Sequence, residues 1–139
     1  MKILTKYSLH FAWLIVLISI TASLYFSEIK LYVPCALCWV QRIAMYPLIA
    51  ILTVGIILKD KNLPLYVLPL SIFGSIVAFY QTLLNWGVVP ERLAPCQLGI
   101  SCTTKYINWF GFITIPLLSF TAFILIIFAM IIYVKGNRK

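Results

Sequence analysis

The chain has 139 residues, of which 63% are hydrophobic and only 10% charged, and its formal net charge is +8. Soluble domains carry about a quarter charged residues, so this composition excludes an ordinary soluble protein and indicates an integral membrane protein. The basic residues flank apolar runs and do not form one patch, which argues against a nucleic-acid partner.

Four apolar runs follow one another along the chain, at about residues 9–26, 37–58, 65–84 and 110–134. Each is long enough to cross a hydrocarbon core of about 30 Å, which takes about 20 helical residues. Because the backbone must satisfy its own hydrogen bonds in lipid, we expect four helices. Segments 27–36 and 85–109 then form two loops on the same side. The sequence predicts a single all-α domain, a bundle of four transmembrane helices.

The first run also has features of a secretory signal, since Lys2 and Lys6 precede it and Thr21-Ala22-Ser23 lies near its end. The run continues through Phe26 and is long enough to span the bilayer. We therefore expect it to be retained as the first helix.

The basic residues predict the orientation, because they are enriched on the cytoplasmic side of membrane proteins. One side carries seven of the 11 Lys and Arg residues: Lys2, Lys6, Lys59, Lys61, Lys135, Arg138 and Lys139. The other side carries Lys30, Arg92 and Lys105, and Arg42 lies within a span. Both termini are thus predicted to be cytoplasmic, with all four cysteines at the outer face of a multi-pass protein in the cell membrane. Disulfides persist at that face.

The first cysteine pair lies in Pro34-Cys35-Ala36-Leu37-Cys38, where the second span begins. Pro34 suits the entry to a helix, which places Cys35 and Cys38 in the first turn. A helix N-terminus favours a thiolate, and Cys-x-x-Cys motifs often carry a lowered thiol pKa. The pair is therefore a candidate for thiol–disulfide exchange. A structural bridge and half of a zinc site remain alternatives.

Arg42 follows Cys38 by four residues and so shares its helix face. It is expected to stabilise a thiolate at Cys38 and to donate hydrogen bonds to a carbonyl bound at the membrane edge. The alternative is an interfacial arginine that extends its charge to the headgroups.

The second pair, Cys96 and Cys102, brackets a five-residue segment with Gly99 at its centre. A loop of this length allows the Cα separation of roughly 4.4–6.8 Å that a disulfide needs. A structural staple is one interpretation. The other is a relay, in which Cys96–Cys102 takes electrons from a partner dithiol and Cys35–Cys38 takes them next. A membrane quinone fits as the final acceptor, because it partitions into the bilayer and offers carbonyls to Arg42.

This ordered set resembles the DsbB-type disulfide bond formation proteins, above all their short Gram-positive BdbC form. The likeness spans essentially the whole chain: four spans, the Cys35–Cys38 motif with Arg42 after it, the second pair, and Tyr106-Ile107-Asn108-Trp109-Phe110-Gly111 before the last span. It implies a bacterial membrane enzyme that reoxidises an exported thioredoxin-like thiol oxidase (BdbD- or DsbA-like). The electrons then pass to a membrane quinone, by resemblance menaquinone.

The resemblance also implies residue roles. Cys38 is the cysteine that faces the quinone, with Arg42 beside it, and Cys35 exchanges with the second pair. Cys96 is attacked by the partner, and Cys102 resolves toward Cys35. The redox-active disulfides are then Cys35–Cys38 and Cys96–Cys102.

The chain departs from the longer Gram-negative pattern, since its second pair is closely spaced and its loop is short. Members of the family often carry a His near the outer end of the third span, where this chain has Tyr80-Gln81. Gln81 is therefore a candidate donor to a quinone carbonyl. Vitamin K epoxide reductase-like proteins have their Cys-x-x-Cys motif after the loop pair, so the order here disfavours that class.

Two non-catalytic alternatives remain: two structural disulfides, or one zinc site made by all four cysteines. The zinc site needs four reduced thiolates at an oxidising face, so no bound metal is expected.

Overall fold

The computed structural model describes residues 2–94, 101–102 and 114–138. Four long helices run along the bundle: α1 (Lys2–Leu24), α2 (Ala36–Leu58), α3 (Leu63–Asn85) and α4 (Ile115–Asn137). A π-helical turn, η1 (Tyr25–Ile29), continues α1, and a short 3₁₀ turn, η2 (Glu91–Leu93), follows α3. All four long helices are long and apolar enough to cross a membrane. This confirms the predicted fold class.

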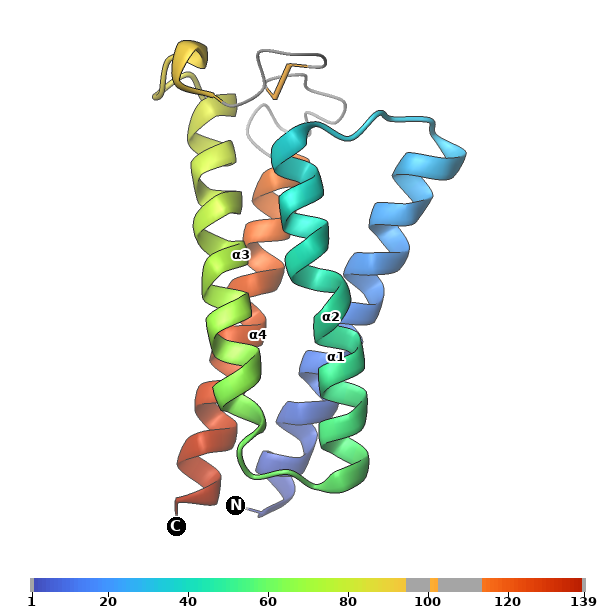
Figure 1. Ribbon diagram of the computed structural model, residues 1–139. Helices are drawn as coiled ribbons and strands as arrows, with labels where there is room; N and C mark the ends of the chain where they lie inside the picture. The colour runs from blue at the N-terminus through green and yellow to red at the C-terminus, as the bar shows by residue number, and fades with distance from the viewer. Residues whose placement is uncertain (1, 95–100, 103–113, 139) are drawn as a thin grey trace.

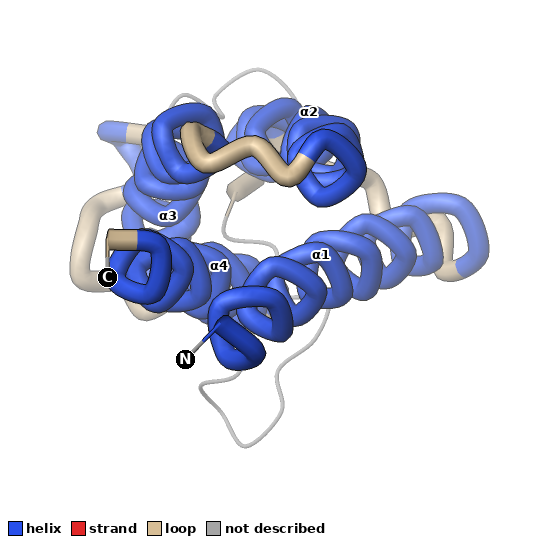
Figure 2. Tube along the Cα trace, turned by 90° about the horizontal axis from the view of Figure 1, so that it is seen from below, coloured by secondary structure: helices blue, strands red, loops and turns tan. Residues whose placement is uncertain are grey.

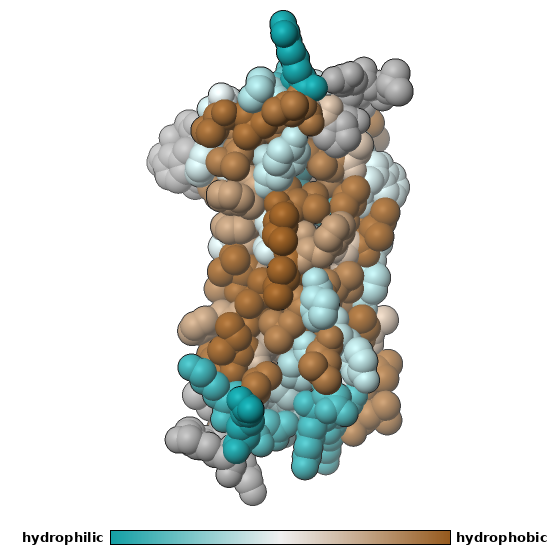
Figure 3. Space-filling view, turned by 60° about the vertical axis from the view of Figure 1, so that its left-hand side comes forward, coloured by the Kyte–Doolittle hydropathy of each residue, from teal (hydrophilic) through white to brown (hydrophobic). Residues whose placement is uncertain are grey.

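The helices are arranged in a ring in which each packs against the next and α4 returns to α1 (Figures 1 and 2). The short α2–α3 connection lies at the same end as both termini, and the first turn of α2 lies at the other end (Figure 1). Hydrophilic residues gather at the end with the termini, and apolar side chains cover the length of the bundle (Figure 3). The assignment of this end to the cytoplasm stays a prediction.

The helix ends extend somewhat beyond the apolar runs in the sequence. α1 begins at Lys2 and, with η1, continues to Ile29, so it includes polar residues that flank the predicted span of 9–26. α2 ends where Lys59 takes a left-handed conformation (φ 52°), and its N–H bonds to the Gly55 carbonyl. Residues 110–113 of the predicted fourth span lie outside the described residues, and α4 itself begins at Ile115.

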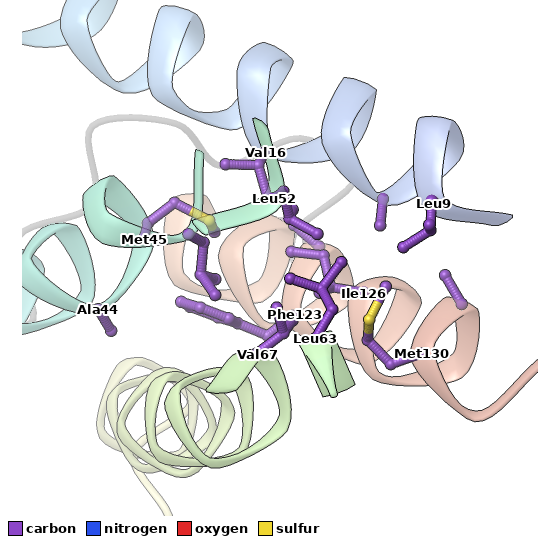
Figure 4. Packing of buried hydrophobic residues seen from close by; sticks show 14 of the residues in the cluster. Leu9, Val16, Ala44, Met45, Leu52, Leu63, Val67, Phe123, Ile126 and Met130 are labelled. Atoms are coloured by element: carbon purple, nitrogen blue, oxygen red, sulfur yellow. The ribbon is translucent and has the colours of Figure 1, made fainter. Parts of the chain in front are cut away.

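The core lies between the four helices and contains large side chains from each of them. Val16, Leu52, Phe123 and Ile126 are fully enclosed and point toward one another (Figure 4). The ring of Phe123 lies against Gly74, where an added Cβ would be only 2.3 Å from Cζ of that ring. Small residues on α3 thus let α4 approach closely, as is usual for helices packed in lipid.

Candidate redox site at one end of the bundle

Cys35 and Cys38 lie at the start of α2, at the end of the bundle opposite the termini. Cys35 is the N-cap residue, with extended backbone (φ −75°, ψ 171°), and its sulfur accepts a hydrogen bond from the Cys38 N–H at 3.4 Å. Both cysteines are free thiols, and their Sγ atoms lie 2.8 Å apart in a hydrogen bond. One helical turn therefore holds the two sulfurs within reach of a disulfide.

The environment of Cys35 favours the protonated thiol over the thiolate. The hydrogen bond with Cys38 raises the pKa of the Cys35 thiol above its ordinary value, and burial raises it further. Cys35 is 6% exposed, so little water reaches it. A proton shared by the two sulfurs consequently stays on Cys35.

Gln81, from α3, contacts both sulfurs. Its Nε2 donates to Cys35 Sγ at 3.1 Å and to Cys38 Sγ at 3.3 Å. Its side-chain oxygen accepts a hydrogen bond from Gln41 Nε2 at 2.6 Å. The structure thus brings Gln81 to the cysteines, and its role toward a quinone stays a prediction.

Gln41 belongs to the site although it was not among the residues expected from the sequence. It is buried, at 8% exposed, and comes three residues after Cys38 on the same face of α2. The signal was present in the sequence, because an uncharged amide one turn inside an apolar span needs a hydrogen-bonding partner. The sequence does not indicate which helix supplies it.

Arg42 extends from α2 toward α1. Its Nη2 donates to the Ser23 carbonyl at 2.9 Å, and its Nη1 donates to Ser27 Oγ at a longer 3.5 Å. The guanidinium carbon lies 5.6 Å from the centre of the Trp39 ring, within the range of a cation–π contact. Among the described residues, these partners of Arg42 are all uncharged.

A cavity of about 370 Å³ opens beside this group. Its lining includes Cys38, Arg42 and Tyr46 from α2, Phe26 from η1 and Ser119 from α4. The upper part of α1 diverges from α2 here (Figure 1), so the cavity lies between α1, α2 and α4. Most of its lining is apolar, and the lining also includes Cys35, Gln81 and Cys102.

Cys102, from the second cysteine pair, lies in one buried cluster with Cys35. Cys102 is disulfide-bonded and 2% exposed. It packs in a cluster with Cys35, Leu37, Leu84 and Ala94, and Cys38 lies against this cluster. Cys96, its predicted partner, lies outside the described residues, as does segment 106–111.

Asn85, at the end of α3, forms a hydrogen bond that connects the Cys102 segment to the bundle. Its Nδ2 donates to the Cys102 carbonyl at 3.3 Å and to the Gln81 carbonyl at 3.0 Å. The same side chain therefore links the segment that carries Cys102 to the helix that contacts Cys35 and Cys38. Asn85 was not among the residues expected from the sequence.

Comparison with known proteins identifies the family of this chain. The family model described as "Disulfide bond formation protein DsbB" matches residues 5–134. The chain belongs to this family of membrane proteins that form disulfide bonds, which confirms the resemblance inferred from its motifs.

Named relatives match along nearly their whole length. The chain is 45% identical over 131 residues to "Disulfide bond formation protein C" of Bacillus subtilis, covering 94% of each protein. It is 44% identical over 124 residues to "Probable disulfide formation protein C" of Halalkalibacterium halodurans, covering 89% of this chain and 90% of the relative. It is 41% identical over 139 residues to "Probable disulfide formation protein C 2" of Bacillus cereus, covering 100% and 98%. No solved structure matches the chain significantly.

Proposed function

We propose that this protein reoxidises an exported thioredoxin-like thiol oxidase and passes the electrons to a membrane quinone. One observation carries the proposal: disulfide-bonded Cys102 packs in the same buried cluster as Cys35, and both of them line the cavity together with Cys38. Such an arrangement lets two electrons move from the outer pair to the inner pair and on toward the lipid.

The exchange between proteins starts at the outer pair. A thiolate of the partner attacks Cys96, which forms a mixed disulfide and breaks the Cys96–Cys102 bond. The partner's second thiolate then displaces Cys96, so the partner leaves with a disulfide. Cys96 and Cys102 now hold the two electrons, and the partner's two protons are released or carried with them.

The electrons next move between the two pairs. The Cys102 thiolate attacks Cys35 of the Cys35–Cys38 disulfide and releases Cys38. Attack of Cys96 on Cys102 then frees Cys35 and restores the outer disulfide. A disulfide at Cys102 together with thiols at Cys35 and Cys38, as in this structure, corresponds to the state after this step.

The cavity fits a quinone, by resemblance menaquinone. Its volume of about 370 Å³ lies within the range of roughly 300–1,000 Å³ that is typical of small-molecule sites. Phe26 and Met45 supply apolar surface for a flat ring, and Arg42 supplies N–H donors for a carbonyl. A quinone bound there would supply the final two-electron, two-proton acceptor, and the Cys35–Cys38 dithiol would return to a disulfide. Cys35 and Cys38 both line this space, and by resemblance Cys38 is the cysteine that faces the quinone.

The orientation belongs to the same proposal. With the lysine-rich end of the bundle in the cytoplasm, the cysteines lie at the extracytoplasmic face, where the exported partner works. The redox site then lies at the outer edge of the lipid, within reach of both the partner and the quinone.

The test uses purified protein in detergent, a reduced thioredoxin-like dithiol and a soluble quinone. Quinone reduction followed by absorbance should proceed with the wild type and stop in Cys38→Ser. The absence of turnover with any quinone, in protein whose cysteines are all inert disulfides, would establish the structural alternative. Stoichiometric zinc would establish the metal site, which needs Cys102 as a thiolate.

A further inference from the structure

Two buried amides form a chain of hydrogen bonds that ends on the sulfurs of Cys35 and Cys38. Gln41 Nε2 donates to Gln81 Oε1 at 2.6 Å, and Gln81 Nε2 donates to the two sulfurs at 3.1 and 3.3 Å. Gln41 is 8% exposed and Gln81 is 2% exposed. The chain crosses from α2 to α3 and returns to α2, so the packing of these two helices holds it together.

The direction of this chain depends on Gln41. An amide group has an acceptor end and a donor end, so it can present either to a neighbour. With Gln41 donating to its oxygen, Gln81 must turn its NH₂ group toward the sulfurs. The reversed amide would leave the Gln41 N–H without its acceptor in a buried place, which is costly.

The donors matter because the two redox states of the pair differ in charge. When the Cys35–Cys38 disulfide takes up two electrons, its S–S bond breaks and negative charge develops on sulfur until protons bind. An N–H donor stabilises an anionic sulfur more than it stabilises a neutral disulfide. A correctly oriented Gln81 therefore favours the reduced form.

We propose that Gln41 is a positioning residue that orients the Gln81 amide and thereby makes the Cys35–Cys38 disulfide more oxidising. This inference rests on the proposed function, because it assumes that this pair cycles between disulfide and dithiol. In this proposal Gln41 orients the Gln81 amide, and Gln81 donates its hydrogen bonds to the two sulfurs. A more oxidising inner pair draws electrons from the outer pair.

The experiment measures the reduction equilibrium of the Cys35–Cys38 pair without quinone or partner. Purified protein is equilibrated in dithiothreitol buffers of increasing oxidised fraction, and the free thiols are alkylated and counted by peptide mass spectrometry. In this reaction dithiothreitol gives two electrons and two protons and closes its own ring disulfide. The Cys96–Cys102 pair is read from its own peptides.

Replacing Gln81 with Met removes the donors and keeps the side-chain length. We expect Gln81→Met to lower the equilibrium constant for reduction by about tenfold, which equals about 30 mV for a two-electron couple. Gln41→Met should shift it in the same direction by at least about threefold. The double variant should match Gln81→Met alone, because Gln41 acts through Gln81.

Thr53→Val is the matched control, since Thr53 is also a hydrogen-bonded polar side chain on α2 but bonds to Trp13 and Ile49. It should leave the equilibrium unchanged. A wild-type equilibrium in Gln41→Met, or additive effects in the double variant, would overturn the inference. A lowered melting temperature with an unmoved equilibrium would show a purely structural role and would overturn it as well. If Cys35 and Cys38 form no disulfide in any buffer, the proposed function fails too.

Discussion

The substitution Arg42→Lys tests directly whether Arg42 binds a quinone carbonyl in the cavity. The guanidinium has five N–H donors, and two of them bond to Ser23 and Ser27, which leaves donors for a ligand carbonyl. Lys keeps the positive charge but loses the planar fork of donors. We therefore expect Arg42→Lys to weaken quinone binding while the exchange between cysteine pairs continues.

The magnitude follows from the loss of one hydrogen bond to a charged group. Such bonds contribute about 1.5–3 kcal/mol, and each ~1.4 kcal/mol is a factor of ten. The KM for quinone should rise by about 10- to 100-fold. Steady-state quinone reduction at saturating partner dithiol gives this number, and a single-turnover reaction without quinone should retain the wild-type rate of partner oxidation.

Two further variants separate ligand binding from helix positioning. Ser27→Ala removes only the 3.5 Å bond from Arg42 and should raise KM by less than about twofold, because such a long contact is weak. Lys30→Gln removes an exposed cation at the C-terminal end of η1 and should leave KM unchanged. A KM in Arg42→Lys that stays within about twofold of wild type would refute the role of Arg42 at the cavity.

The remaining predictions concern packing and the link between the two pairs. Gly74→Ala places a Cβ 2.3 Å from the Phe123 ring, and overpacking of this kind costs about 1–3 kcal/mol. Its melting temperature in detergent should fall, and Phe123→Leu should recover part of the loss; an unchanged value would contradict the close approach of α3 and α4. Asn85→Leu removes the bond to the Cys102 carbonyl, worth about 1 kcal/mol. Rapid-quench alkylation should show interpair exchange slowed by about fivefold, and a wild-type rate would contradict the anchoring role.

The helices were predictable because their cause is local. Any chain segment that crosses lipid must satisfy its own backbone hydrogen bonds, so a long apolar run is enough to predict a helix. The Cys35–Cys38 spacing was informative for the same reason, since one turn of one helix places both sulfurs together. The outward tilt of α1 and the π-helical turn after it were not predictable, because they depend on what packs beside them.

The sequence by itself thus determined the four-helix membrane fold, the location of the cysteine motif at a helix start, and the family. Only the tertiary structure decided that Gln41 and Gln81, 40 residues apart, form one hydrogen-bonded pair, and that Gln81 contacts sulfur. It also decided that Arg42 extends to α1 and that Cys102 packs beside Cys35. The physical reason is that a single sequence encodes the faces of each helix, whereas the contacts between faces depend on how all four helices pack together.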